Sequence, residues 1–185
     1  MPRTSDKREK LLHAAAALIH RHGYDQTTLA DIADESGVPL GNVYYYFKTK
    51  DEIGSAVIEQ HYALMRAMLN DCDAHADPRG RLVRFLDKMC GQRDALAKYG
   101  CPVGSLCVEL NKSSRSLSKQ ADSILKSQLD WVTKRFREMG RADAKELGVQ
   151  MIAMLQGVTL LANTLSDPSV IARQIRRMKE WVQTI

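Results

Sequence analysis

The sequence predicts an all-α protein of about nine helices. Apolar residues recur three and four positions apart through most of its length, and we find no alternation typical of β-strands. Five prolines and few aromatic residues stand among many Leu, Ala, Met, Lys and Glu, a composition that favours helices. With 185 residues, the chain is long enough for one or two domains with a substantial core.

The first helix is expected from about Asp6 to Gly23, with Glu9 as the capping partner three residues after Asp6. Its apolar residues recur at helical spacing and mark one buried face. That face consists of Leu11, Leu12, Ala15, Leu18, Ile19 and His22.

Residues 26–53 predict two short helices joined by a tight turn. Thr28 and Asp31 have the spacing of a capping box, and Gly37 can end the first helix in a left-handed conformation. Pro39 suits the first turn of the second helix. This is the helix-turn-helix arrangement, which places its second helix in the major groove of DNA. An ordinary buried helical hairpin is the alternative interpretation.

The later helices are placed by capping residues and by apolar periodicity. Thr49 and Glu52 form another capping box, and Asp77-Pro78 and Asp167-Pro168 are pairs of a cap and a first-turn residue. The expected helices cover residues 49–72, 78–100, a stretch from 102, 117–139, 143–165 and a last stretch from 168.

The helix over 143–165 is apolar on most sides and must be buried on most sides. Its two apolar lines consist of Leu147, Met151, Met154, Val158 and Leu161, and of Ile152, Leu155, Thr159 and Ala162. The last helix has a stripe through Ile171, Ile175, Met178, Val182 and Ile185. A domain of this size has limited interior for both, so we expect burial in a twofold homodimer. Packing inside the monomer alone is the alternative.

Over about residues 8–60 the chain resembles the N-terminal domain of the tetracycline-repressor (TetR) family. The resemblance rests on Gly23-Tyr24, Thr28, Ile32-Ala33, Gly37-Val38, Gly41, Tyr44, Tyr46-Phe47 and Lys50-Asp51-Glu52. It implies a three-helix DNA-binding domain over residues 1–50. It also implies a helical domain for ligand binding and dimerisation over 51–185, with the last two long helices forming a four-helix bundle in the dimer.

The expected DNA-binding residues fall into two groups. Phosphate contacts are expected from the helix start at Thr28, from the phenols of Tyr44 and Tyr45, and from Lys50. The resemblance assigns base reading to Pro39, Leu40, Gly41 and Asn42. Here the chain departs from family members with stronger base-reading side chains, because it has no Arg, Lys or Gln at these four positions. Asn42 is the one strong hydrogen-bonding side chain, and Leu40 suits a thymine methyl, so DNA shape is expected to contribute to specificity.

Tyr46 and Phe47 are expected in the core, with a direct DNA contact by Tyr46 as the alternative. An effector site is expected among later helices, with Phe85, Met89, Cys101 and Trp131 as candidate contacts. Cys101 is expected near a helix N-cap, where the helix dipole favours thiolate. The stretch around it is similar to a Gly-Cys-x-x-Gly segment of some family members, a few of which sense electrophiles through a cysteine. The alternative interpretation is that these residues are core.

Several other classes of protein are disfavoured. Cys72, Cys90, Cys101 and Cys107 form no CxxC pair, so free thiols, no metal and a cytoplasmic location are expected. The polar start and the lack of an apolar run near about 18 residues argue against a membrane protein. An enzyme is disfavoured because the histidines lie on expected helical faces without placed carboxylate partners. These are His13, His20, His22, His61 and His75.

The net charge of +5 suits an anionic partner, although residues 1–50 hold seven Lys/Arg against six Asp/Glu. We therefore expect a ligand-responsive transcriptional regulator, most readily a repressor, without a cofactor. Its partners would be double-stranded operator DNA, a small-molecule effector and a second copy of the chain. A cysteine-based electrophile or redox sensor acting through Cys101, and a DNA-binding protein without an effector, are the alternatives.

Overall fold

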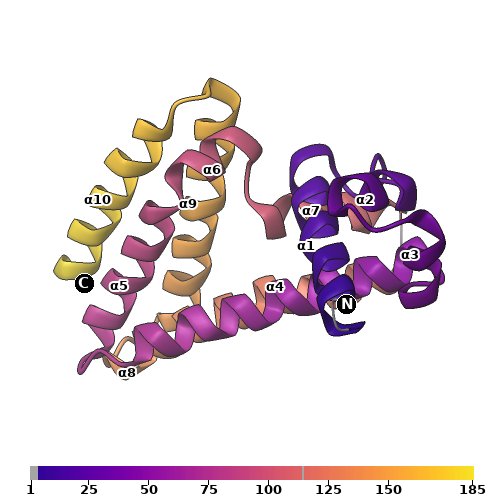
Figure 1. Cartoon of the computed structure of the whole chain (residues 1–185). Helices are drawn as coiled ribbons and strands as arrows, with labels where there is room; N and C mark the ends of the chain where they lie inside the picture. Colours follow the sequence, from indigo (N-terminus) through magenta and orange to yellow (C-terminus); the bar gives the residue numbers. More distant parts are fainter. Residues whose placement is uncertain (1–3, 114) are drawn as a thin grey trace. The chain divides into compact units, whose positions relative to one another are not determined.

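The structure, a computed structural model, describes residues 4–113 and 115–185, and this part of the chain consists of ten α-helices without a β-strand. The predicted all-α fold is therefore confirmed. Along the chain the helices are α1 (Thr4–His22), α2 (Leu29–Ser36), α3 (Leu40–Tyr46), α4 (Lys50–Asp73), α5 (Pro78–Gly91), α6 (Arg93–Tyr99), α7 (Pro102–Ser113), α8 (Arg115–Glu138), α9 (Ala144–Leu165) and α10 (Pro168–Thr184) (Figure 1).

The stretch expected as one helix over 78–100 is two helices. α5 ends at Gly91 and α6 begins at Arg93. Between them, the N–H of Gln92 donates to the carbonyl of Met89 three residues back, so the α-helical hydrogen-bond pattern is interrupted. A glycine weakens a helix interior, which explains why the break falls beside Gly91.

The chain forms two compact units. The first contains the described residues of Met1–Tyr62 and Ser105–Ser123, and the second contains Ala63–Gly104 and Ile124–Ile185. α4, α7 and α8 each contribute to both units. The functional boundary near residue 50 stays a prediction, because compactness divides the chain at other residues.

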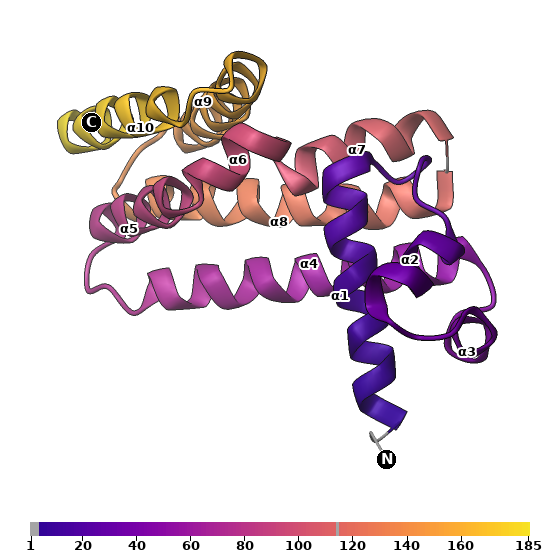
Figure 2. The ribbon, with the colours of Figure 1, turned by 45° about the horizontal axis from the view of Figure 1, so that its top comes forward.

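In the first unit, α2 packs against α1 and α3 (Figure 2). Its interior is apolar because each short helix directs one face inward. The fully or nearly fully buried side chains include Leu11, Ile32, Val43, Phe47 and Ile53.

In the second unit, α10 packs against α5 and α9, and α6 packs against α9 (Figure 1). Asp77 caps α5 by accepting a hydrogen bond from the N–H of Gly80, and Asp167 caps α10 through the N–H of Ser169. The apolar stripe of α10 is buried within this unit, including Ile171, Ile175, Met178 and Val182. These α10 side chains are therefore already covered within one chain.

α9 divides its apolar residues between two environments. Leu147, Met151 and Leu155 are buried on one side of the helix. Four large apolar side chains are exposed, namely Val149, Leu160, Leu161 and Leu165. Leu161, expected on the same line as Leu147 and Met151, thus lies outside the core of this unit.

By length and composition, α9 could also cross a membrane, with a mean hydropathy of 1.3 over its best window. This corrects the expectation that no stretch of the chain approaches that limit. One such helix is weak support for a membrane span, because core helices of water-soluble proteins meet the same test. The burial of Met151 and Leu155 in the second unit is the behaviour of a core helix.

Candidate nucleic-acid interface

The start of α2 has the capping box that the sequence predicts. The N–H of Asp31 donates to the hydroxyl oxygen of Thr28 at 3.1 Å, and the N–H of Thr28 donates to the Asp31 carboxylate at 2.8 Å. The Thr28 hydroxyl donates to the same carboxylate at 2.7 Å. Hydrogen bonds from the side chain and backbone of Thr28 lower the pKa of Asp31. The exposed Thr28 thus fixes the first turn of α2 at the surface.

The turn between α2 and α3 is built on Gly37 and Pro39. Gly37 has a φ of 65°, and its N–H donates to the carbonyl of Asp34. Glycine adopts such a φ without strain, so it is the favoured residue where α2 ends. Pro39 is the N-cap residue of α3 and directly precedes its first residue, Leu40.

α3 exposes the positions expected to read bases. Pro39, Leu40 and Gly41 are exposed and Asn42 is half-buried, whereas Val43 is fully buried and anchors the helix. The exposed start of α3 therefore presents a small apolar surface with one amide, as the sequence predicts.

The tyrosines of α3 differ in their burial. Tyr44 is 48% exposed and Tyr45 is 70% exposed, so both phenols can reach a partner outside the unit. Phe47 is buried, and the Arg8 guanidinium lies over its ring at 5.3 Å. Tyr46 is half-buried and makes an edge contact with Tyr45 at 5.1 Å between ring centres. The prediction of a core position is confirmed for Phe47, while Tyr46 lies at the margin of the core.

Lys50 begins α4 and reaches back to the turn that follows α1. Its Nζ donates to the carbonyl of Asp25 at 2.9 Å and lies 4.6 Å from the centre of the Tyr24 ring. The adjacent cap is also formed, because the N–H of Glu52 donates to the Thr49 hydroxyl at 3.1 Å. Contact between Lys50 and a phosphate stays a prediction.

Gly23, Tyr24 and Asp25, here called the α1–α2 corner, are held by residues far away in the sequence. The N–H groups of Tyr24 and Asp25 donate to the two carboxylate oxygens of Glu109 on α7, each at 2.7 Å. The Tyr24 hydroxyl donates to Asp51 at 2.7 Å. Burial raises the pKa of Tyr24 most, and this hydrogen bond raises it further. Sequence reasoning missed Glu109, because no local pattern relates residues 84 and 85 positions apart.

The expected effector residues lie in the second unit but do not form one group. Phe85 is fully buried and packs against Trp131 with ring centres 5.7 Å apart, and Met89 belongs to the same apolar cluster. Cys101 lies outside that cluster at the start of α7. Its Sγ accepts a hydrogen bond from the N–H of Gly104 at 3.3 Å, as expected of a residue near an N-cap.

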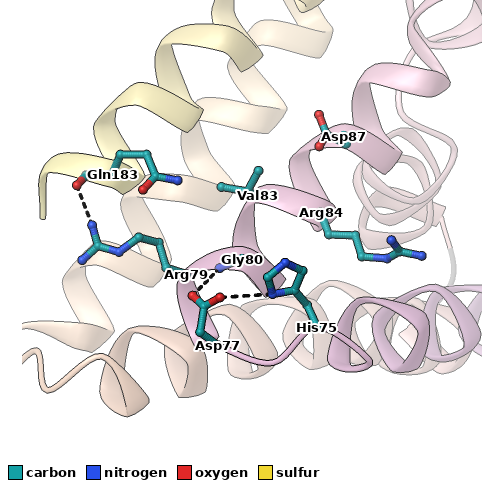
Figure 3. Close-up of a pocket in the computed structure, with 8 residues that line it drawn as sticks. All are labelled: His75, Asp77, Arg79, Gly80, Val83, Arg84, Asp87 and Gln183. Carbon is teal, nitrogen blue, oxygen red and sulfur yellow. Dashed lines mark hydrogen bonds and ion pairs between the residues drawn. The ribbon is translucent and has the colours of Figure 1, made fainter.

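The second unit also contains an open hollow of about 420 Å³ with a polar lining (Figure 3). It is lined by His75, Asp77, Arg79, Gly80, Val83, Arg84, Asp87 and Gln183, none of which was expected to contact an effector. His75 Nδ1 lies 3.1 Å from the Asp77 carboxylate. This pair corrects the expectation that each histidine lies on a helical face without a carboxylate partner, because His75 follows the end of α4.

The thiols differ in their surroundings. Burial raises the pKa of Cys72 to about 11, which disfavours its reactive thiolate form. Cys101 is half-buried, and Gln156 Nε2 lies 3.7 Å from its Sγ. Within residues 4–113 and 115–185, no group of three or more His, Cys, Asp or Glu side chains could hold a metal ion.

Comparison with known proteins identifies relatives of both halves of the chain. Residues 11–57 match "Bacterial regulatory proteins, tetR family", and residues 78–176 match "Transcriptional regulator LmrA/YxaF-like, C-terminal domain". The HTH-type transcriptional regulator LmrA of Bacillus subtilis is 31% identical over 167 residues, which cover 88% of this chain and 89% of LmrA.

Solved structures share the fold at lower identity. A TetR transcriptional regulator from Legionella pneumophila superposes with a TM-score of 0.84 at 23% identity, covering 100% of this chain and 98% of that one. The reduced form of NemR from E. coli gives a TM-score of 0.82 at 19% identity, covering 95% and 96% of the two chains. These likenesses show a common fold, including the helix-turn-helix.

Replacing Thr28 with Val should raise the pKa of Asp31 toward its usual value, because the hydroxyl contacts are lost. A lowered pKa makes the cap stabilising above about pH 4, and this contribution is lost as the pH falls through the lowered pKa. Carboxyl-carbon NMR titration of wild type and Thr28→Val measures the change. Asp77 is the internal control and should keep its pKa, which is lowered mainly by the hydrogen bond from the N–H of Gly80. An unchanged Asp31 titration would contradict the cap's role.

Proposed function

Because the chain belongs to the TetR family of bacterial transcriptional regulators, with an LmrA/YxaF-like C-terminal domain, we propose that it is a ligand-responsive repressor. In this proposal it acts in the cytoplasm as a homodimer on a near-palindromic operator, and a small molecule releases it from DNA. The observation that carries the proposal is the exposed start of α3 between the capped α2 and the buried anchor Val43. This is the geometry that a recognition helix needs in order to enter the major groove.

The surface around α3 supports two kinds of DNA contact, namely phosphate contacts that position the protein and base contacts that read the sequence. The start of α2 at Thr28, the phenols of Tyr44 and Tyr45, and the cation of Lys50 would contact phosphates. Pro39, Leu40, Gly41 and Asn42 would face the bases. Asn42 suits adenine, and Leu40 suits the methyl group of thymine. With so few base-reading groups, sequence-dependent DNA shape would supply much of the specificity.

We expect wild-type protein to select near-palindromic duplexes from a random-sequence library. Lys50→Ala should weaken binding to all duplexes alike and reduce the slope of log affinity against log salt by about one, because one phosphate contact is lost. Asn42→Ala should instead change the preferred sequence. Fluorescence anisotropy over a range of salt concentrations measures both effects. Lys88→Ala, which removes the same charge from α5, is the control, and failure of the wild type to select any sequence would contradict the proposal.

The exposed apolar side chains of α9 support a homodimer. They recur at helical spacing, so they form one face, and they are Val149, Ala153, Leu160, Leu161 and Leu165. An isologous contact between two copies of this face would bury it, and a twofold axis is the commonest way to do so. The resemblance to the family predicts an interface formed by the last two long helices, α9 and α10, as a four-helix bundle in the dimer.

Leu160→Glu should dissociate the dimer, because a carboxylate buried in an apolar interface is costly. The control is Leu64→Glu on α4, since Leu64 is 61% exposed and Leu160 is 66% exposed in one chain. Sedimentation at micromolar concentration should therefore give a monomer for Leu160→Glu and a dimer for Leu64→Glu. DNA binding should weaken only in the first variant, because a monomer loses the mutual tethering of two half-sites. A wild type that sediments as a monomer would contradict the proposed assembly.

For the effector we favour an apolar compound bound beside Phe85, Met89 and Trp131. A second candidate is a reactive electrophile, and it is favoured by the hydrogen bond from the Gly104 N–H to Cys101 Sγ at 3.3 Å. In either case the effector must bind the released form better than the DNA-bound form, and a change from 1:99 to 99:1 requires about 5.5 kcal/mol.

Cys101→Ser separates the two effector chemistries. Non-reactive apolar compounds found by thermal-shift screening should release DNA from wild type and from Cys101→Ser alike. A bulky residue at Met89 should blunt this response by occupying the site. N-ethylmaleimide, a thiol-alkylating probe, should release DNA through Cys101 only if the second candidate is correct. Loss of the response to every inducer in Cys101→Ser would overturn the apolar site.

A further inference from the structure

We propose that Glu109 of α7 is a positioning residue for the DNA-binding surface. Its carboxylate accepts both N–H groups of the α1–α2 corner and so fixes the backbone that leads into α2. The inference rests on the proposed function, since its consequence is measured as DNA affinity. It adds a residue of the second half of the chain to the machinery that the first half needs in order to bind.

The two hydrogen bonds form a matched pair. The N–H of Tyr24 donates to Glu109 Oε2 and the N–H of Asp25 donates to Oε1, each at 2.7 Å. Bonds to an ionised acceptor are shorter and stronger than those between neutral groups. Because each oxygen of one carboxylate binds one of two successive N–H groups, the pair fixes the direction of the backbone as well as its position.

Gly23 is fitted to this carboxylate. Its φ is 89°, a conformation that suits glycine. A Cβ atom at this position would lie 3.0 Å from Glu109 Oε1 and 3.1 Å from Oε2, which is closer than ordinary contact. The missing side chain therefore allows the carboxylate to approach the backbone of the corner.

The corner is also the meeting point of the groups expected to contact DNA. Lys50 Nζ donates to the carbonyl of Asp25, whose N–H is held by Glu109. The Thr27 hydroxyl donates to the carbonyl of Gly23 at 2.8 Å, and Thr28 caps α2 directly afterwards. Movement of Asp25 therefore changes the support of Lys50 and the start of α2 together.

The direction in which DNA affinity changes distinguishes a positioning role of Glu109 from a simple effect of its charge. Glu109→Gln removes a negative charge, which by itself would strengthen binding to the DNA polyanion. However, the glutamine has one acceptor oxygen, so one of the two N–H groups loses its partner. If Glu109 positions the corner, the substitution must weaken binding despite the more favourable charge.

The experiment uses the full chain and the duplex that wild type selects from a random-sequence library. Glu109→Gln should weaken binding about tenfold, which is about 1.4 kcal/mol. Glu109→Asp keeps the charge but shortens the reach, and should weaken binding as well. Glu59→Gln is the control, because Glu59 is exposed on α4 and the charge change is the same. It should bind as tightly as wild type or slightly more tightly.

Amide hydrogen exchange tests the contact without DNA. In wild type the N–H groups of Tyr24 and Asp25 should be protected from exchange. In Glu109→Gln at least one of these amide hydrogens should exchange about tenfold faster. Unprotected amides in wild type, or unchanged DNA affinity in both Glu109 variants, would overturn the inference. A wild type with protected amides that selects no duplex would instead overturn the proposed function, so the two failures are distinguishable.

Discussion

The α1–α2 corner fixes the backbone that leads from α1 into α2. At Gly23 the chain leaves α1, and the next two N–H groups have no helical carbonyl to bind. Glu109 accepts both, so the turn is held by a residue from α7 as well as by the local hydrogen bond from the Thr27 hydroxyl to the Gly23 carbonyl. Tyr24 is buried, and an unpaired N–H group is costly where water is excluded, so this acceptor stabilises the turn. The same turn presents the Asp25 carbonyl that accepts the hydrogen bond of Lys50 Nζ.

Apolar burial and apolar exposure are separated on a single helix, α9. Met151 and Leu155 complete the interior of the second unit, while Leu160 and Leu161 stay exposed. α10 differs, because its apolar stripe is buried against α5 and α9 and its outer face is polar. An exposed apolar face beside a complete core supports association between chains more directly than an unfinished core would. The helix that stabilises the unit is thus also the one that the proposed dimer needs.

A polar group lies beside the residues proposed for effector binding. Arg135, only 4% exposed, lies within 3.1 Å of carboxylate oxygens of Asp73 and Glu138, and its guanidinium lies 4.9 Å from the Trp131 ring. Trp131 Nε1 donates to Asp73 at 3.2 Å. These contacts hold the indole, and Phe85 packs on it without exposed surface. An effector at this place must therefore displace packed side chains, which links its binding to movement of the surrounding helices.

The sequence by itself determined most helices, the caps of α2, α5 and α10 and the helix-turn-helix, because these depend on residues within one or two turns. It did not reveal the break between α5 and α6. Thr28 with Asp31 and the left-handed Gly37 are such cases. Tertiary structure decided what depends on distant residues: the pairing of Glu109 with the corner, the inward reach of Lys50, and the separation of Cys101 from the cluster around Phe85. It also decided which apolar residues of α9 stay exposed. Periodicity shows that a helix is apolar, but burial depends on which neighbours cover each face.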